Sequence, residues 1–147
     1  MTPVTDLLAK PFPDIELVFL DLLSPAFPSA TVVTALPTDL KGKIIQVERA
    51  GGSDDGITDR PRVRVRVFAG TRPLSWELAR QVGAFLTAKG TTTLITGPET
   101  AAEYPNGVQL DSVSTATPPR QMPEGVATRD ARVVDTTYEV HLRRPWW

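Results

Sequence analysis

Residues 62–68 read RVRVRVF, a strict alternation of arginine and valine that is the strongest structural signal in the chain. Because successive side chains of a β-strand point to opposite faces of its sheet, Val63, Val65 and Val67 share one face and the arginines share the other. The stretch therefore predicts a strand with one dry face and one basic face. We expect the valines to form core against an amphipathic helix predicted at residues 75–88.

A partner strand is predicted just before this stretch. Residues 43–50 read KIIQVERA, which places Ile45 and Val47 on one face and their alternate neighbours on the other. The intervening residues 51–56, GGSDDG, are of types that favour turns. Residues 43–50 and 62–69 are thus expected to pair as antiparallel strands joined by a loop.

Two helices are predicted. Asp14 is placed to cap the first, which is expected to end before Pro25 because a residue preceding proline avoids the helical conformation. The second is expected over residues 75–88 and should stop at Gly90. The apolar stripe of the first helix comprises Ile15, Val18, Phe19, Leu22 and Leu23, and that of the second Leu78, Val82, Phe85 and Leu86.

Three more strands are predicted, at residues 30–36, 108–117 and 134–143, and residues 97–107 are expected to form a loop. Within the second of these strands, one face is expected to carry Val108, Leu110 and Ser112, and the other Gln109, Asp111 and Val113. An extended linker is expected next, because a sheet interior would not allow Pro118, Pro119 and Pro123.

These elements predict one α+β domain over residues 1–147. Its sheet is expected to be mixed, largely antiparallel and built of about four to five strands, with two helices packed on one face. Extended loops and two terminal arms, at residues 1–13 and 144–147, complete the expected architecture. A chain of 147 residues can bury about two-thirds of its unfolded surface, which is enough for one core.

The composition excludes several classes of function. The formal net charge is −1, so bulk charge does not indicate a nucleic acid or a membrane as partner. The chain has no cysteine, which excludes thiolate nucleophiles, iron–sulfur clusters and cysteine-ligated zinc. No apolar stretch approaches the roughly 20 residues that a bilayer requires, so a soluble product in the cytoplasm is expected.

Catalytic chemistry finds little support in the sequence. His141 is the single histidine, so a serine triad or another small hydrolase would depend on it, and an ordinary surface histidine is the alternative. Asp54, Asp55 and Asp59 form a local acidic cluster but lack the order of a calcium-binding loop. Neither glycine-rich phosphate-binding motif occurs. We therefore expect no enzyme, no cofactor and no metal site.

The main candidates for a functional surface are Arg62, Arg64 and Arg66. Such a stripe can bind phosphates or the carboxylates of a partner protein. The alternative is a solvated face on which the arginines pair across strands with Glu48, Asp135 or Glu139. No aromatic residues interleave with the arginines to stack bases, so interface salt bridges are favoured over nucleic-acid recognition.

The C-terminal residues and the predicted loop after the first strand of the pair add further candidates. Trp146 and Trp147 follow Arg143, and aromatic and arginine side chains are favoured at interface cores. The alternative is that the tryptophans fold back onto their own subunit. Asp54 and Asp55, in the predicted loop at residues 51–60, complete the set of candidate contact residues.

The order of these features resembles the tail terminator family of long-tailed, lambda-type bacteriophages, the siphoviruses. The resemblance rests on the N-terminal helix, on the loop that leads into the alternating strand (51–68) and on the helix SWELARQVGAFL (75–86). It is completed by a proline-rich stretch (118–123) before a terminal strand, VVDTTYEVHLR (133–143). The long connection before that strand and the two terminal tryptophans do not map onto the family's pattern.

This resemblance implies a structural virion protein without catalytic residues or cofactors. It implies a homohexameric ring that caps the completed tail tube at the head–tail junction, assembled in the host cytoplasm. The implied partners are further copies of the chain, the major tail tube protein and the head-completion or connector proteins below the portal, with DNA passing through the lumen without specific binding and no membrane involved. The alternatives are a head-closure protein or other ring-forming connector, a tail tube protein and, from another class, a nucleic-acid-binding module.

Overall fold

The computed structural model describes residues 12–35, 41–54, 58–88, 93–121 and 133–143. These residues form two helices and six strands, an α+β fold as predicted. In chain order the elements are α2 (Ile15–Ala26), β1 (Ala30–Val33), β2 (Lys43–Asp54), β3 (Thr58–Phe68), α3 (Arg72–Thr87), β4 (Thr93–Ile95), β5 (Val108–Gln121) and β6 (Val133–Arg143).

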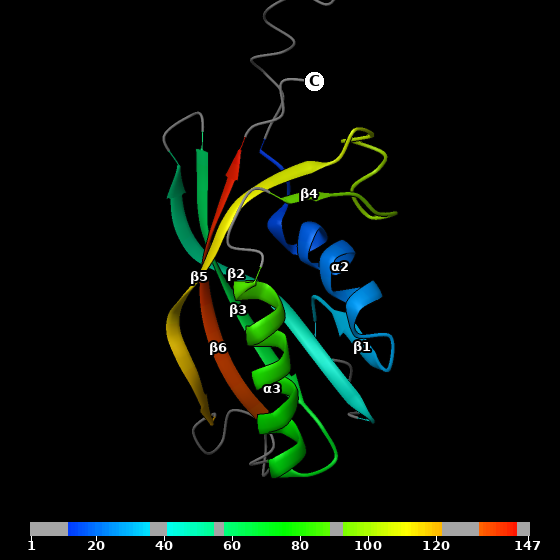
Figure 1. The fold of residues 1–147 in the computed structure, drawn as a ribbon, viewed down its shortest axis with the longest axis vertical. Helices are drawn as coiled ribbons and strands as arrows, with labels where there is room; N and C mark the ends of the chain where they lie inside the picture. The colour runs from blue at the N-terminus through cyan, green and yellow to red at the C-terminus, as the bar shows by residue number, and fades with distance from the viewer. Residues whose placement is uncertain (1–11, 36–40, 55–57, 89–92, 122–132, 144–147) are drawn as a thin grey trace, which may run out of the picture.

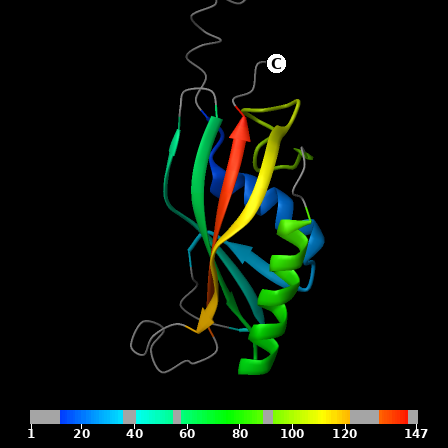
Figure 2. The ribbon, with the colours of Figure 1, turned by 60° about the vertical axis from the view of Figure 1, so that its left-hand side comes forward.

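All six strands belong to one mixed sheet with the order β1-β2-β3-β6-β5-β4. β1 runs parallel to β2, and every other neighbouring pair is antiparallel. The sheet is strongly twisted (Figure 1), and both helices lie on one of its sides (Figure 2). The sequence predicted four to five strands, because β4 is only three residues long and its pattern, TLI, carries no periodic signal.

The alternating stretch forms β3 as predicted, and its valines are core. Val63, Val65 and Val67 are each at most 1% exposed and belong to the main apolar cluster together with Leu78 and Val82 of α3. β3 lies between β2 and β6, so its backbone is hydrogen-bonded on both sides. The predicted pairing of the alternating strand with the strand before it is confirmed.

The first helix does not end before Pro25, and that prediction was wrong. Asp14 caps α2 as expected, accepting a hydrogen bond from the backbone N–H of Glu16 at 2.9 Å. The helix continues to Ala26, and the N–H of Phe27 still donates to the carbonyl of Leu23 at 2.9 Å. Proline in the last turn removes one donor but leaves the final bond intact, so the helix tolerates it there.

The second helix begins earlier than predicted. Its N-cap is Thr71, whose hydroxyl accepts from the N–H of Leu74, and Pro73 lies in the first turn, where a missing N–H costs nothing. Leu78, Val82 and Leu86 are buried, as the apolar stripe predicted. α3 ends at Thr87, and the predicted stop at residue 90 lies outside the described residues.

The loop predicted at residues 51–56 is in part strand. β2 continues to Asp54, and a bulge between Arg49 and Gly52 inserts one extra residue opposite β3. Gly51 and Gly52 have φ of +105° and +114°, which only glycine adopts without strain. The two glycines therefore bend the strand and do not end it.

The prediction that the sheet ends before Pro118 was also wrong. β5 runs to Gln121 with Pro118 and Pro119 inside it, while Pro123 lies outside the described residues. Within the described ranges, this half of β5 has β6 on one side and no strand on the other, since β4 pairs with residues 108–110. An edge strand tolerates proline because no second neighbour needs its N–H.

Bulges in β5 also change the faces predicted for its residues. The register with β6 shifts by one residue at three places, the first between Leu110 and Ser112. Val113 therefore joins Leu110 in the buried core, although strict alternation placed it on the opposite face. Each bulge increases the local twist, which fits the marked bend of β5 in Figures 1 and 2. The strand predicted at residues 30–36 is shorter, ending at Val33.

Candidate functional site: a charged face and one end of the sheet

The sheet face turned away from both helices, called the arginine face below, carries the arginines of the alternating strand. Arg62, Arg64 and Arg66 alternate with the core valines of β3 and therefore project to this face. The neighbouring strands bring acidic and amide residues beside them. In the register of the sheet, Arg62 lies opposite Glu139, Arg64 opposite Glu48 and Thr137, and Arg66 opposite Gln46 and Asp135.

Arg64 and Arg66 are paired with acidic residues on both flanking strands. Arg64 lies 3.8 Å from Glu48 on β2 and 3.7 Å from Asp135 on β6, measured between the charged atoms. Arg66 reaches the same Glu48 at 3.7 Å. Arg120 on β5 extends the cluster, 3.9 Å from Asp135. The cross-strand pairing proposed for Glu48 and Asp135 is thus present, and the arginine stripe does not form an isolated positive patch.

Glu139 does not join this network. Its carboxylate lies 3.7 Å from Nε2 of His141. Glu139 is the register partner of Arg62, but their side chains form no ion pair among the described residues. Arg62 itself is exposed, in contrast to Arg64 and Arg66, whose side chains are 33% and 20% exposed. Arg62 is therefore the most accessible arginine of the stripe.

Four polar atoms of the arginine face are buried without a hydrogen-bond partner in the described part of the chain: Oε1 of Gln46, Nε of Arg64, Nε of Arg66 and Oδ1 of Asp135. Asp135 and Gln46 are 2% and 7% exposed. Leaving such a group unpaired costs about 1–3 kcal/mol. Two donors and two acceptors thus remain without hydrogen bonds within one small area of the sheet, just below its surface.

Asp54 and Arg143, two of the remaining candidates, lie at one end of the sheet. Thr58, the first residue of β3, pairs with Arg143, the last residue of β6, so the β2–β3 hairpin and the end of β6 lie side by side. Asp54 is exposed at the end of β2. The side chain of Arg143 is 46% exposed and forms an ion pair of 3.4 Å with Asp111 of β5. Asp55, Trp146 and Trp147 lie outside the described residues.

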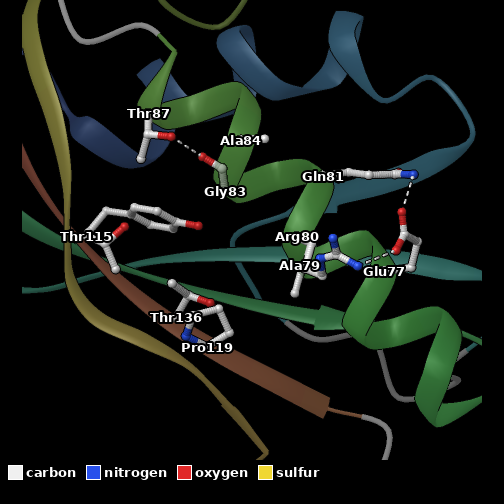
Figure 3. A pocket seen from close by; sticks show the side chains of 11 residues that line it. Glu77, Ala79, Arg80, Gln81, Gly83, Ala84, Thr87, Thr115, Pro119 and Thr136 are labelled. Carbon is white, nitrogen blue, oxygen red and sulfur yellow. Dashed lines mark hydrogen bonds and ion pairs between the residues drawn. The ribbon is translucent and has the colours of Figure 1, made fainter.

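The structure also shows a groove that the sequence did not indicate. It lies between α3 and the strands β5 and β6, with a volume of about 480 Å³ (Figure 3). Thr115, Pro119 and Thr136 line its strand side, and Ala79 and Gly83 are among the small residues of its helix side. The small helix residues leave room beside the sheet, and no hydrophobic periodicity marks them as lining a groove.

Tyr138 lies at the base of this groove and belongs to the core. Burial raises the pKa of its phenol to about 12, and a hydrogen bond with the side chain of Thr136 offsets part of the rise. The phenol therefore stays neutral to a higher pH than an ordinary tyrosine does. A Cβ on Gly83 would lie only 3.1 Å from the Tyr138 hydroxyl, so glycine at this position gives the phenol its space.

The described residues do not assemble a catalytic or metal-binding site. His141 lies on the arginine face beside Glu139 and does not line the groove. No group of three histidine or acidic side chains suited to a metal ion occurs in the ranges that the structure describes. Within the same ranges, no helix is long and apolar enough to cross a membrane. The notable surfaces are therefore the arginine face, the hairpin end of the sheet and the groove.

Sequence reasoning found the arginines but missed two members of their cluster. Gln46 was placed beside Ile44 on the outer face of β2, and a lone amide within the apolar run IIQV was a signal that this face is partly buried. Arg120 was assigned to a linker because of the prolines before it, so its pairing with Asp135 was not foreseen.

Comparison with models of protein families gives a match over most of the chain. The model described as "Phage tail termination protein" matches residues 11–146, which is nearly the whole chain. No curated protein matches the chain. The match spans both helices, all six strands of the described residues and every candidate contact residue except Trp147.

Proposed function

Because the chain belongs to the phage tail termination protein family, we propose that it forms a homohexameric ring that caps the completed tail tube and joins it to the head-completion proteins. As a member of this family it is a structural protein of the virion tail, not an enzyme, and it interacts with the tail tube. The tail-terminator resemblance in the sequence is thereby confirmed. The ring, its stoichiometry and the head-side partners are the proposal.

The unpaired polar atoms of the arginine face are the observation that carries the proposal of a protein contact there. Gln46 and Asp135 are more than nine-tenths buried, yet each keeps an oxygen without a hydrogen bond. Among the described residues, the Nε atoms of Arg64 and Arg66 donate no hydrogen bond, although Nε of Arg64 lies 3.7 Å from Oδ2 of Asp135 within their ion pair. These atoms have almost no accessible surface in the single chain, so a partner reaches them only when the neighbouring side chains shift. A protein surface would then offer both donors and acceptors, whereas a polyanion offers acceptors alone.

The charge balance of the arginine face argues in the same direction. Glu48 and Asp135 neutralise much of the positive charge of Arg64, Arg66 and Arg120. DNA phosphates approaching this face would meet two carboxylates as well as the guanidinium groups, which weakens non-specific binding. A ring around DNA can therefore present this face to the lumen or to a protein without holding the DNA.

The hairpin end of the sheet is the proposed contact with an adjoining ring. Asp54 and Arg143 carry opposite charges, lie at the same end of the sheet and are exposed or half-exposed. Asp55 follows the first of them directly in sequence, and Trp146 and Trp147 follow the second at short distance. In a ring, Asp54 and Arg143 of each subunit would then form a circle of charged contacts facing along the tail axis.

The ring is tested by measuring the mass of the purified chain in solution and by negative-stain imaging. Closed rings of six 16.0 kDa subunits that never extend into tubes are the expected result. A chain that stays monomeric, both alone and with purified tail tubes, contradicts the proposal. Tubes that grow without limit would instead identify a tube-forming protein.

The arginine face is tested with Arg64→Ala, using Arg80→Ala as the matched control. Arg80 is also an arginine in an ion pair, but it lies on α3 with its side chain 75% exposed and pairs only with Glu77 of its own helix among the described residues. Arg64→Ala is expected to weaken ring formation or tube binding at least about tenfold, and Arg80→Ala to leave both unchanged. Equal behaviour of the two folded variants would exclude the arginine face as a contact.

DNA binding is tested separately by a mobility shift at about 50 mM salt, where phosphate contacts are strongest. The chain is expected not to retard duplex DNA under these conditions. Retardation that disappears on raising the salt would support the nucleic-acid-binding alternative instead.

A further inference from the structure

The outer edge of β5 is open over a defined length. β5 pairs with β6 along its course, but β4 covers only residues 108–110 on the other side. Pro118 and Pro119 have no N–H, so neither can donate a hydrogen bond to a further strand on this outer side. Residues 111–117, called the open edge below, have no strand on their outer side in the described part of the chain. Ser114, Thr115 and Ala116 at its centre are exposed.

The sheet has a second outer edge at its other end. β1 consists of Ala30–Val33 and, among the described residues, pairs with β2 on one side only; Pro28 precedes it in sequence. Thr31 is exposed, while Val32 and Val33 are partly buried against the main and the smaller apolar cluster, respectively. In Figure 1, β1 and the second half of β5 lie on opposite sides of the subunit.

Two different edges on opposite sides of one subunit are what a closed ring requires. A ring is built by heterologous contacts, in which one surface of each copy binds a different surface of the next. An unpaired strand edge presents a row of free N–H and C=O groups that pairs readily with another strand. When the last copy meets the first, every such edge in the ring is used, and no edge remains to recruit further chains.

We propose that the open edge of β5 in one copy pairs with β1 of the next copy, so that the sheet continues from subunit to subunit around the ring. This inference rests on the proposed ring and names the contact that closes it. Prolines bound both edges and limit the pairing to a few residues, which fixes where the strands can meet. Val32 and Val33, which are incompletely covered in the single chain, would gain apolar contacts from the neighbouring strand.

The register of the sheet indicates which side chains would come together. Thr31 pairs with Ile44, which places it on the arginine-face side, and Ser114 pairs with Glu139 on the same side. Thr115 pairs with Tyr138 and so lies on the helix side. Across a shared ladder, residues on the same face approach closely, whereas residues on opposite faces do not.

Because the chain has no cysteine, introduced cysteines can test this pairing without background. Thr31→Cys is combined with Ser112→Cys or with Ser114→Cys, and the control combines Thr31→Cys with Gln81→Cys on the exposed side of α3. Cysteines on adjacent strands can form a disulfide when their Cβ atoms lie about 3.5–4.5 Å apart. The three double variants are oxidised mildly and separated on a non-reducing denaturing gel. Their assembly is measured in parallel by native mass.

At least one of the two same-face pairs is expected to give a ladder of covalent oligomers up to the hexamer, and the control pair is expected to stay monomeric on the gel. Rings that form normally while neither same-face pair cross-links overturn the β5–β1 contact and leave the proposed ring standing. Covalent dimers from Ser114→Cys alone would show β5 pairing with β5, which also overturns it. A chain that forms no ring at all contradicts both this inference and the proposed function.

Discussion

Asp21 on α2 holds Thr100 with two hydrogen bonds, accepting from its backbone N–H at 2.9 Å and from its hydroxyl at 2.7 Å. The same carboxylate accepts a third bond from the N–H of Glu99 at 3.0 Å. Asp21 is only 5% exposed, and a Cβ on Gly97 would collide with its side chain. A loop 78 residues further along the chain is thereby fastened to the first helix.

Asp21→Ala is expected to lower the free energy of unfolding by about 3 kcal/mol, because three donors lose their charged acceptor in a largely buried place. Chemical denaturation monitored by circular dichroism measures the change. Glu77→Ala serves as the control, since Glu77 is exposed and its ion pair with Arg80 should contribute less than about 0.5 kcal/mol. A loss for Asp21→Ala no larger than for the control would show that the loop is not held by this carboxylate.

Gly52→Ala is expected to be far more destabilising than Gly51→Ala, although both glycines have positive φ. A Cβ at Gly51 meets nothing within 4 Å, so that substitution carries only backbone strain of about 1–3 kcal/mol. A Cβ at Gly52 would collide with the backbone of Arg60 and Pro61 on β3. Thermal unfolding of the two variants compares them directly. Equal losses would mean that the hairpin relaxes without cost around the new methyl group.

Arg49 and Asp59 form an ion pair, and removing one partner is expected to destabilise the fold more than removing the other. Two hydrogen bonds of 2.9 and 3.0 Å join them, but Asp59 is buried whereas the side chain of Arg49 is 37% exposed. Arg49→Ala leaves the buried carboxylate of Asp59 without its partner and should lower the free energy of unfolding by about 3 kcal/mol. Asp59→Ala leaves an arginine that can turn toward water, so its loss should be smaller. A double-mutant cycle on unfolding free energies tests the order. The reverse order would contradict it.

Tyr138 is expected to make the fold sensitive to alkaline pH. Burial raises the pKa of Tyr138 to about 12, whereas an unfolded tyrosine titrates near pH 10. Above about pH 10 the unfolded state therefore loses a proton that the folded state retains. The stabilisation is complete below that pH and declines by about 3 kcal/mol as the pH rises to about 12.

The Tyr138→Phe variant isolates this effect from the other groups that titrate in the same range. The difference in unfolding free energy between the parent and the variant should fall as pH rises between about 10 and 12. A difference that is constant across this range would show that the phenol ionises equally in the two states.

The strands with regular alternation were predictable because their successive side chains point in turn to the buried face and to the solvent-facing side of the sheet. Val63, Val65 and Val67 on β3, and Val134, Tyr138, Val140 and Leu142 on β6, are all buried as their pattern required. β4 and the second half of β5 escaped prediction for opposite reasons. The first is too short to show a period, and the bulges of the second break the period that it has.

The arginines of the candidate surface could be read from the sequence, but their surroundings could not. A period of two predicted that Arg62, Arg64 and Arg66 share a face, and Glu48 and Asp135 were among the partners expected from the strand pattern. Which arginine meets which carboxylate depends on the register of three strands. The burial of Asp135 and Gln46 also depends on this register. Their burial is what makes this face differ from an ordinary solvated surface, because it leaves polar atoms without hydrogen bonds.

The sequence by itself determined the α+β class, the core face of the central strands and the tail-terminator family, because these depend on local periodicity and on the order of elements along the chain. The tertiary structure alone decided that the last strand lies in the centre of the sheet and that β1 and the open edge of β5 lie at its outer sides. It also brought the hairpin next to Arg143. Such contacts join residues far apart in sequence, and only the pairing of whole strands sets which of them meet.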